Sequence, residues 1–203
     1  MNDLTLKHWL DLLAVWNIDA GAARLAFDDL CRRYSEPGRY YHTLDHVRNV
    51  LETVVQLGSR ARNLHAIRLA AWLHDVIYDS RAADNEERSA AFAEDLCKTF
   101  SIPAGGVVAG LILKTKRHDD AGDPDAQVLL DADLAILGAG ESDYLAYAGN
   151  IRREYAWVSE PEYRTGRCGV LQRFLARPRI FHFLTGLEER ARRNMAAELM
   201  RLT

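Results

Sequence analysis

Apolar residues recur at helical spacing along most of the chain. After His46 the apolar positions are Val47, Val50, Leu51, Val54 and Val55. They follow an i, i+3, i+4, i+7, i+8 stripe, which places them on one face of a helix. Thr43 or Asp45 stands where the cap of this helix is expected, and Gly58 with Ser59 is expected to end it.

The same periodicity predicts seven further helices. They cover residues 62–77, 85–100, 104–116, 125–137, 141–158, 160–175 and 187–202. The first of them is apolar on most faces, which predicts a central helix with His74 and Asp75 in its last turn. Residues 118–125 are polar and contain glycine and proline, so a loop is expected there. No segment alternates with period two, and the sequence therefore predicts an all-α fold: a compact multi-helix bundle forming a single domain over residues 1–203.

Composition and charge narrow the class of protein. The 203 residues are 48% hydrophobic and 27% charged, as is typical of a globular protein. No apolar run approaches the roughly 18 residues needed to span a membrane, and no signal peptide is evident, so we expect a cytoplasmic protein without a membrane partner. Cys31, Cys97 and Cys168 are too scattered for a disulfide framework or a CxxC zinc site. The net charge of -3 does not predict binding to a nucleic-acid polymer.

His74 and Asp75 directly follow the apolar run of residues 69–73. A charged pair in such a place is costly unless it binds something, and both side chains are ligands for divalent cations. His46 and Asp133 lie on other predicted helices, and inward-facing ligands from several helices commonly build a metal site. The sequence therefore predicts a metal centre with His46, His74, Asp75 and Asp133 as ligands.

We expect one divalent ion at this centre. Two imidazoles and two carboxylates suit manganese, iron, nickel, cobalt, zinc or magnesium and do not choose among them. Four protein ligands leave two octahedral positions, one for a water and one for a phosphate oxygen. Asp131 competes with Asp133 for the last position. His118 has three open roles: a ligand of a second metal, a phosphate contact or a surface residue.

Four strings of residues, in order along the chain, carry a resemblance to a known family. They are residues 41–47 (YHTLDHV), 71–79 (AWLHDVIYD), 84–90 (DNEERSA) and 130–138 (LDADLAILG). Together they resemble the HD superfamily of metal-dependent phosphohydrolases, and within it a bacterial branch described as predicted HD phosphohydrolases. The resemblance extends over residues 4–202. It implies that His46 is the first metal ligand, His74 and Asp75 the paired ligands, and Asp133 the closing ligand.

The Tyr-His-x-x-x-His arrangement of residues 41–46 is also similar to that of cyclic-nucleotide phosphodiesterases. In those enzymes the earlier histidine donates a proton to the leaving oxygen, which makes His42 the candidate general acid here. A capping or supporting role for His42 is the alternative. Asp75 is the second candidate catalytic residue, because a carboxylate on the metal can accept a proton from water. Candidate substrate-binding or supporting residues are Asp79, Glu86, Lys114 and His118, with capping and solvated helix ends as the alternatives.

These features predict an enzyme, a metal-dependent phosphoric ester hydrolase. Its expected partner is a small phosphorylated substrate, a phosphomonoester or phosphodiester, with nucleotides among the candidates. The alternatives are a metal- or nucleotide-binding module without turnover and, with less support, a di-iron oxygenase, which needs more ligands than the sequence offers. No motif indicates an oligomeric state.

Overall fold

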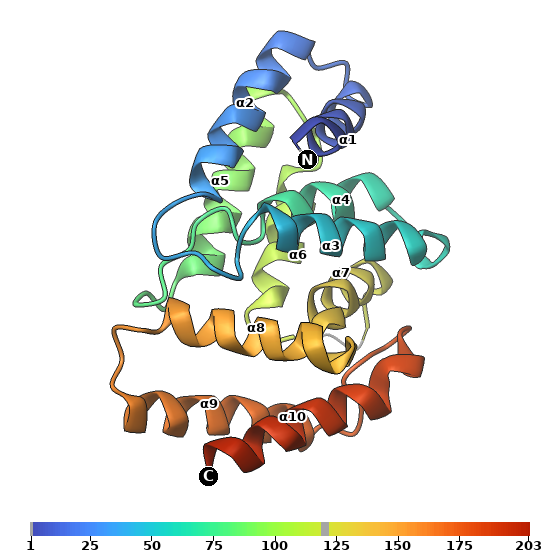
Figure 1. Cartoon of the computed structure of the whole chain (residues 1–203). Helices are drawn as coiled ribbons and strands as arrows, with labels where there is room; N and C mark the ends of the chain where they lie inside the picture. The colour runs from blue at the N-terminus through green and yellow to red at the C-terminus, as the bar shows by residue number, and fades with distance from the viewer. Residues whose placement is uncertain (1, 119–121) are drawn as a thin grey trace.

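The computed structural model describes residues 2–118 and 122–203, and over these residues the all-α prediction is confirmed (Figure 1). No strand occurs among them. The helices are α1 (Asn2–Ala14), α2 (Ala20–Arg33), α3 (Leu44–Gln56), η1 (Gly58–Arg60), α4 (Leu64–Leu73), α5 (Asn85–Thr99), α6 (Gly105–Thr115), α7 (Pro124–Leu134), η2 (Ala135–Gly138), α8 (Glu141–Glu154), α9 (Glu160–Leu175), η3 (Thr185–Leu187) and α10 (Glu188–Leu202). Part of the predicted loop, residues 119–121, lies outside the described residues. No described helix has the length and apolarity that a membrane crossing requires.

The central helix is shorter than the sequence pattern predicts. It is α4, which begins after Asn63, whose side chain accepts a hydrogen bond from the backbone N–H of Ala66, and ends at Leu73. The His-Asp pair therefore lies just beyond the last turn instead of within it. The Arg39 guanidinium donates to the backbone carbonyls of Asp75 and Val76. Because these buried carbonyls are satisfied from outside, the chain can leave the helix here without a large penalty.

The main hydrophobic core surrounds α4. All five residues from Leu69 to Leu73 are fully buried, and α4 packs against α1, α3, α5, α6 and α7. Trp72 lies edge-to-face with Trp9 of α1, with 5.3 Å between ring centroids. This packing holds the segment that follows α4 at a fixed place inside the molecule.

A second hydrophobic cluster joins η2 to the last three helices. Its largest buried members are Tyr144, Leu171, Phe181 and Met195. In Figure 1, α8, α9 and α10 form the lower part of the molecule, drawn in orange to red. The buried Asp131 carboxylate of α7 attaches this part to the main core, because it accepts hydrogen bonds from the backbone N–H groups of residues 182–184. A large cleft remains between the two parts.

Candidate metal centre and active-site cleft

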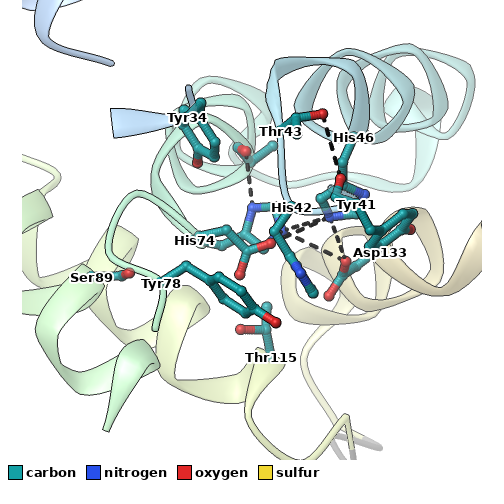
Figure 2. Close-up of polar contacts among 12 residues, drawn as sticks. Tyr34, Tyr41, His42, Thr43, His46, His74, Tyr78, Ser89, Thr115 and Asp133 are labelled. Carbon is teal, nitrogen blue, oxygen red and sulfur yellow. Dashed lines mark hydrogen bonds and ion pairs between the residues drawn. The ribbon is translucent and has the colours of Figure 1, made fainter. Parts of the chain in front are cut away.

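Three segments bring the four predicted ligands together. His46 lies in the first turn of α3, His74 and Asp75 follow α4, and Asp133 lies in the last turn of α7. Both histidines are buried, and the two carboxylates are slightly exposed. Figure 2 shows His46, His74 and Asp133 converging on one point. We refer to these four residues as the ligand cluster.

The donor atoms of the ligand cluster lie at short distances from one another. The Nε2 atoms of His46 and His74 are 3.1 Å apart. His74 Nε2 is 3.1 Å from an Asp75 oxygen, and His46 Nε2 is 3.1 Å from an Asp133 oxygen. The two remaining imidazole–carboxylate distances are 3.5 and 3.6 Å.

The distances among the donors of His46, His74 and Asp75 fit one metal ion. Two donors that each lie about 2.1 Å from an ion are about 3.0 Å apart at a right angle and about 3.4 Å apart at the tetrahedral angle. Within the described residues, His46, His74 and Asp75 form a buried group that could hold a metal ion. Asp133 lies beside this group, 3.1 Å from His46 Nε2, and is not part of it. The chemistry of the set, two imidazoles and two carboxylates, suits a divalent cation.

The backbone orients one of these ligands. His74 Nδ1 lies 3.0 Å from the carbonyl oxygen of Ala71. A carbonyl oxygen only accepts, so Nδ1 carries a hydrogen and Nε2 is the nitrogen that faces the cluster. The structure thus holds the His74 ring in the orientation that a metal ligand through Nε2 requires.

The cluster is strongly coupled electrostatically. Burial opposes the charged form of all four side chains, but their mutual contacts outweigh it. Asp133 and Asp75 raise the pKa of His46, and the same carboxylates raise that of His74 well above its ordinary range. His74 holds the pKa of Asp75 well below its ordinary value, and His118 has the largest such effect on Asp133. Both carboxylates are therefore ionised at neutral pH and available to a cation.

His42 lies beside the ligand cluster and is held by a carboxylate that the sequence analysis did not assign. Its Nδ1 is 2.7 Å from Oε2 of Glu154, the last residue of α8. The ring stacks on Tyr78, with 4.1 Å between centroids, and its centroid is 5.9 Å from that of His46 (Figure 2). Since an ionised carboxylate only accepts, Nδ1 carries the hydrogen and Nε2 is the nitrogen left for other chemistry.

Glu154 also organises the loop before α3. Its Oε1 accepts hydrogen bonds from three successive backbone N–H groups, those of residues 40–42. Its Oε2 accepts a further bond from the Tyr78 hydroxyl at 2.9 Å. Burial would raise the pKa of Glu154, but His42 and the backbone donors lower it to about 2. One signal for this role was present in the sequence: an acid at a helix C-terminus opposes the helix dipole and needs another reason to be there.

Asp131 and Asp133 have different surroundings. Asp131 is fully buried and accepts hydrogen bonds from the backbone N–H groups of residues 182–184. Asp133 lies against His46, and its other oxygen is 2.8 Å from Nε2 of His118. The structure therefore brings Asp133, and not Asp131, to the ligand cluster.

Of the other predicted site residues, two line the cleft and two do not. His118, whose φ of 51° is rare outside glycine, touches Asp133 and lines the cleft. Glu86 also lines the cleft. The Asp79 carboxylate instead accepts a hydrogen bond from the backbone N–H of Arg81, as a loop cap does. Lys114 lies 2.9 Å from an Asp123 oxygen and is not part of the cleft wall.

The ligand cluster opens on the cleft between the two hydrophobic clusters. The cavity has a volume of about 1070 Å³, and Asp75, Asp133 and His42 form part of its wall. Tyrosines at positions 41, 78, 147, 155 and 163 line it as well. A space of this size holds a ligand much larger than a phosphate ion, with aromatic surface beside the charged groups.

Comparison of the chain with protein-family models, curated proteins and solved structures gave no match. The functional assignment therefore depends on the geometry and chemistry of the site.

Proposed function

We propose that this protein is a metal-dependent phosphoric ester hydrolase of the HD type. The observation that supports it most is the meeting at one cleft of a buried His46, His74 and Asp75 group, with Asp133 beside it, and an imidazole oriented by a buried carboxylate. The first can hold a divalent cation, and the second can transfer a proton. Hydrolysis of a phosphate ester needs both.

The proposed reaction assigns a role to each group. When bound, a divalent ion supplies activation of water and neutralisation of charge on the phosphate. Asp75, ionised at neutral pH, accepts a proton from the attacking water. The water oxygen forms the new bond to phosphorus, and the bond to the ester oxygen breaks. His42 donates a proton to that leaving oxygen, while Glu154 holds its ring in place.

Two further residues contact the substrate in this proposal. His118 and Glu86 both line the cleft. His118, whose Nε2 contacts Asp133, donates from Nδ1 to a phosphate oxygen, and Glu86 accepts from a polar group of the leaving alcohol. The proposal gives no role to Asp79 and Lys114, because neither residue is part of the cleft wall.

The first experiment measures bound metal per chain in the wild type, His74→Ala and the control His65→Ala. His65 is an exposed histidine of the same helix and lies outside the ligand cluster. We expect about one transition-metal ion per chain in the wild type and in the control, and none in His74→Ala. Absence of metal from the wild type, even after reconstitution with manganese, nickel, iron or magnesium, contradicts the proposal.

The second experiment measures phosphate release from a panel of phosphomonoesters and phosphodiesters, including nucleotides. His42→Asn is expected to keep its metal and to lose turnover by a factor of about 10² to 10⁴, the usual contribution of general acid–base catalysis. Metal binding without release from any ester identifies a binding module instead. Two ions per chain identify a binuclear site, with His118 and the second oxygen of Asp133 as the added ligands.

A further inference from the structure

One end of the cleft is cationic. Lys116, Arg117 and His118 directly follow α6. Arg173 lies in the last turn of α9, and Arg177 lies just after that helix. All five side chains line the same cavity as the ligand cluster. Such a concentration of donors suits an anion better than any neutral group.

Two of these cations have no counter-ion among the residues that the structure describes. Within the described part of the chain, Arg117 and Arg173 form no ion pair and no side-chain hydrogen bond. Lys116 differs, because it contacts Glu87 and a backbone carbonyl. Arg167, elsewhere in the cleft, is neutralised by Glu198, which binds its Nε and Nη2 at 2.7 and 2.9 Å. The two unpaired guanidinium groups are therefore free to bind a ligand.

The two unpaired arginines face the same part of the cleft. Arg177 donates hydrogen bonds from its guanidinium to the carbonyls of Arg117 and His118, which attaches the end of α9 to the end of α6. Phe174, next to Arg173, lies 6.1 Å from the His118 ring between centroids. These contacts bring the end of α9, which carries Arg173, next to the residues after α6, which include Arg117.

This cationic end is adjacent to the ligand cluster. His118 Nε2 is 2.8 Å from an Asp133 oxygen, and Arg117 is its neighbour in the chain, with about 3.8 Å between consecutive Cα atoms. The acids of the cleft wall outside the cluster are Glu86 and Glu162. Glu162 is in the first turn of α9 and Arg173 in the last, about 16 Å apart along the axis. Glu162 is thus distant from Arg173 along the helix. Glu86 lies nearer to the cationic end, because it acts electrostatically on Lys116.

We propose that the substrate carries a second phosphate group, which Arg117 and Arg173 bind while the phosphate to be hydrolysed lies at the ligand cluster. This inference rests on the proposed function and names its substrate class: small molecules with two phosphate groups on different atoms. Guanidinium groups bind phosphate through paired hydrogen bonds, and two of them in one cleft can bind the same group. The volume of about 1070 Å³ accommodates both phosphates and the body between them.

The test compares molecules that differ by one phosphate. The probes are adenosine 5′-monophosphate with adenosine 3′,5′-bisphosphate, and fructose 6-phosphate with fructose 1,6-bisphosphate. Calorimetric titration uses manganese-reconstituted His42→Asn, so that binding is measured without turnover. For at least one pair we expect the bisphosphate to bind at least about tenfold tighter, since each charge-assisted contact contributes about this factor.

The arginine variants show whether the preference comes from this end of the cleft. Arg117→Ala and Arg173→Ala, each added to His42→Asn, are expected to reduce the preference about tenfold and to leave monophosphate binding unchanged. Arg173→Lys is expected to keep part of it, because lysine retains the charge and loses the paired geometry. Arg24→Ala, an exposed arginine of α2 outside the cleft wall, is the matched control and keeps the preference.

The outcomes separate this inference from the proposed function. Equal binding of both members of both pairs, or a preference that survives the Arg117→Ala, Arg173→Ala double variant, overturns the inference, even where phosphate release is observed. A preference that requires both arginines supports it, even where the wild type releases no phosphate and the proposed hydrolysis fails. Metal content and circular dichroism of each variant are matched to the parent protein before titration.

Discussion

At the scale of single residues, the Glu154 carboxylate accepts several hydrogen bonds, and both of its oxygens take part. One carboxylate oxygen accepts from three backbone N–H groups, and the other contacts His42 and Tyr78. An amide in its place has one accepting oxygen and two donors, so it cannot reproduce this pattern. The residue therefore connects the stability of the loop before α3 to the position of the candidate general acid.

Glu154→Gln is expected to lower stability at neutral pH and to flatten its dependence on acid. The pKa of Glu154 is lowered from 4.5 to about 2. A group with a lowered pKa stabilises the folded state fully above its unfolded value and loses that contribution as the pH falls from about 4.5 towards 2. This shift corresponds to about 3 kcal/mol. Urea unfolding of the wild type and of Glu154→Gln at pH 7, 5, 4 and 3 gives the free energy of unfolding at each pH. If this free energy falls in parallel for the two proteins as the pH is lowered, the prediction is contradicted.

The same substitution tests whether Glu154 positions His42. With phosphate release established, Glu154→Gln is expected to reduce kcat about tenfold or more, to leave the metal content unchanged and to change KM little, because the ring loses the carboxylate that fixes its tautomer. Tyr78→Phe, which removes a neighbouring hydrogen bond to the same oxygen, serves as the milder comparison. A selective change in KM argues against a positioning role.

Asp131 and Asp133 are two positions apart on α7, and their carboxylates have different partners. Asp131→Asn is expected to keep the metal and to cost about 2–4 kcal/mol of stability, since its buried carboxylate satisfies the backbone N–H groups of residues 182–184. Asp133→Asn is expected to lose most of the metal. Elemental analysis and urea unfolding of both variants distinguish the two effects. Loss of metal from Asp131→Asn alone reverses the assignment.

At the scale of elements, the close approach of η2 to η3 depends on a glycine. A Cβ added at Gly138 would lie 2.6 Å from Cβ of Leu187 and 3.1 Å from its carbonyl oxygen. The backbone oxygen cannot move away as a flexible side-chain end can. Gly138 is also an acceptor for the Arg190 guanidinium, so a shift here disturbs the contact between η2 and α10.

Gly138→Ala is therefore expected to destabilise the protein by about 1–3 kcal/mol, as over-packing of a buried contact does. Gly149→Ala is the matched substitution in α8, where an added Cβ meets nothing within 4 Å. It is expected to stabilise the protein by about 0.5–1 kcal/mol, because alanine favours a helix interior more than glycine. Thermal unfolding of both variants tests this prediction. Equal changes in their unfolding temperatures contradict the close contact at Gly138.

At the scale of the whole molecule, the proposed metal would join three segments that are distant in sequence: the start of α3, the end of α4 and the end of α7. An ion that binds only the folded state stabilises it by about 2.7 kcal/mol at a concentration 100 times its Kd. Removal of metal by a chelator should therefore lower the unfolding temperature of the wild type. His74→Ala should show no such response, whereas His65→Ala should respond as the wild type does. A chelator effect of equal size in His74→Ala contradicts the metal centre.

Part of the candidate site could not be predicted from the sequence, because it forms only where the two hydrophobic clusters pack together. The ligand cluster could be predicted because His46, His74, Asp75 and Asp133 have a recognisable order and spacing. Arg117 and Arg173 have no such pattern, and Glu154 had only the weak signal of an acid at the end of a helix. They meet the site only because α8 and α9 pack beneath the main core, as Figure 1 shows.

The sequence alone determined the helical character of the chain and the residue types that can bind a metal. Both follow from local physics: apolar spacing specifies helices, and histidine next to aspartate specifies donor chemistry. Tertiary structure decided that α4 ends before His74, because Arg39 satisfies the carbonyls beyond it. It also decided between Asp131 and Asp133, since two residues so close in the chain differ only in which backbone and side-chain partners face them. Burial and long-range hydrogen bonding are properties of the packed molecule, and no local pattern encodes them.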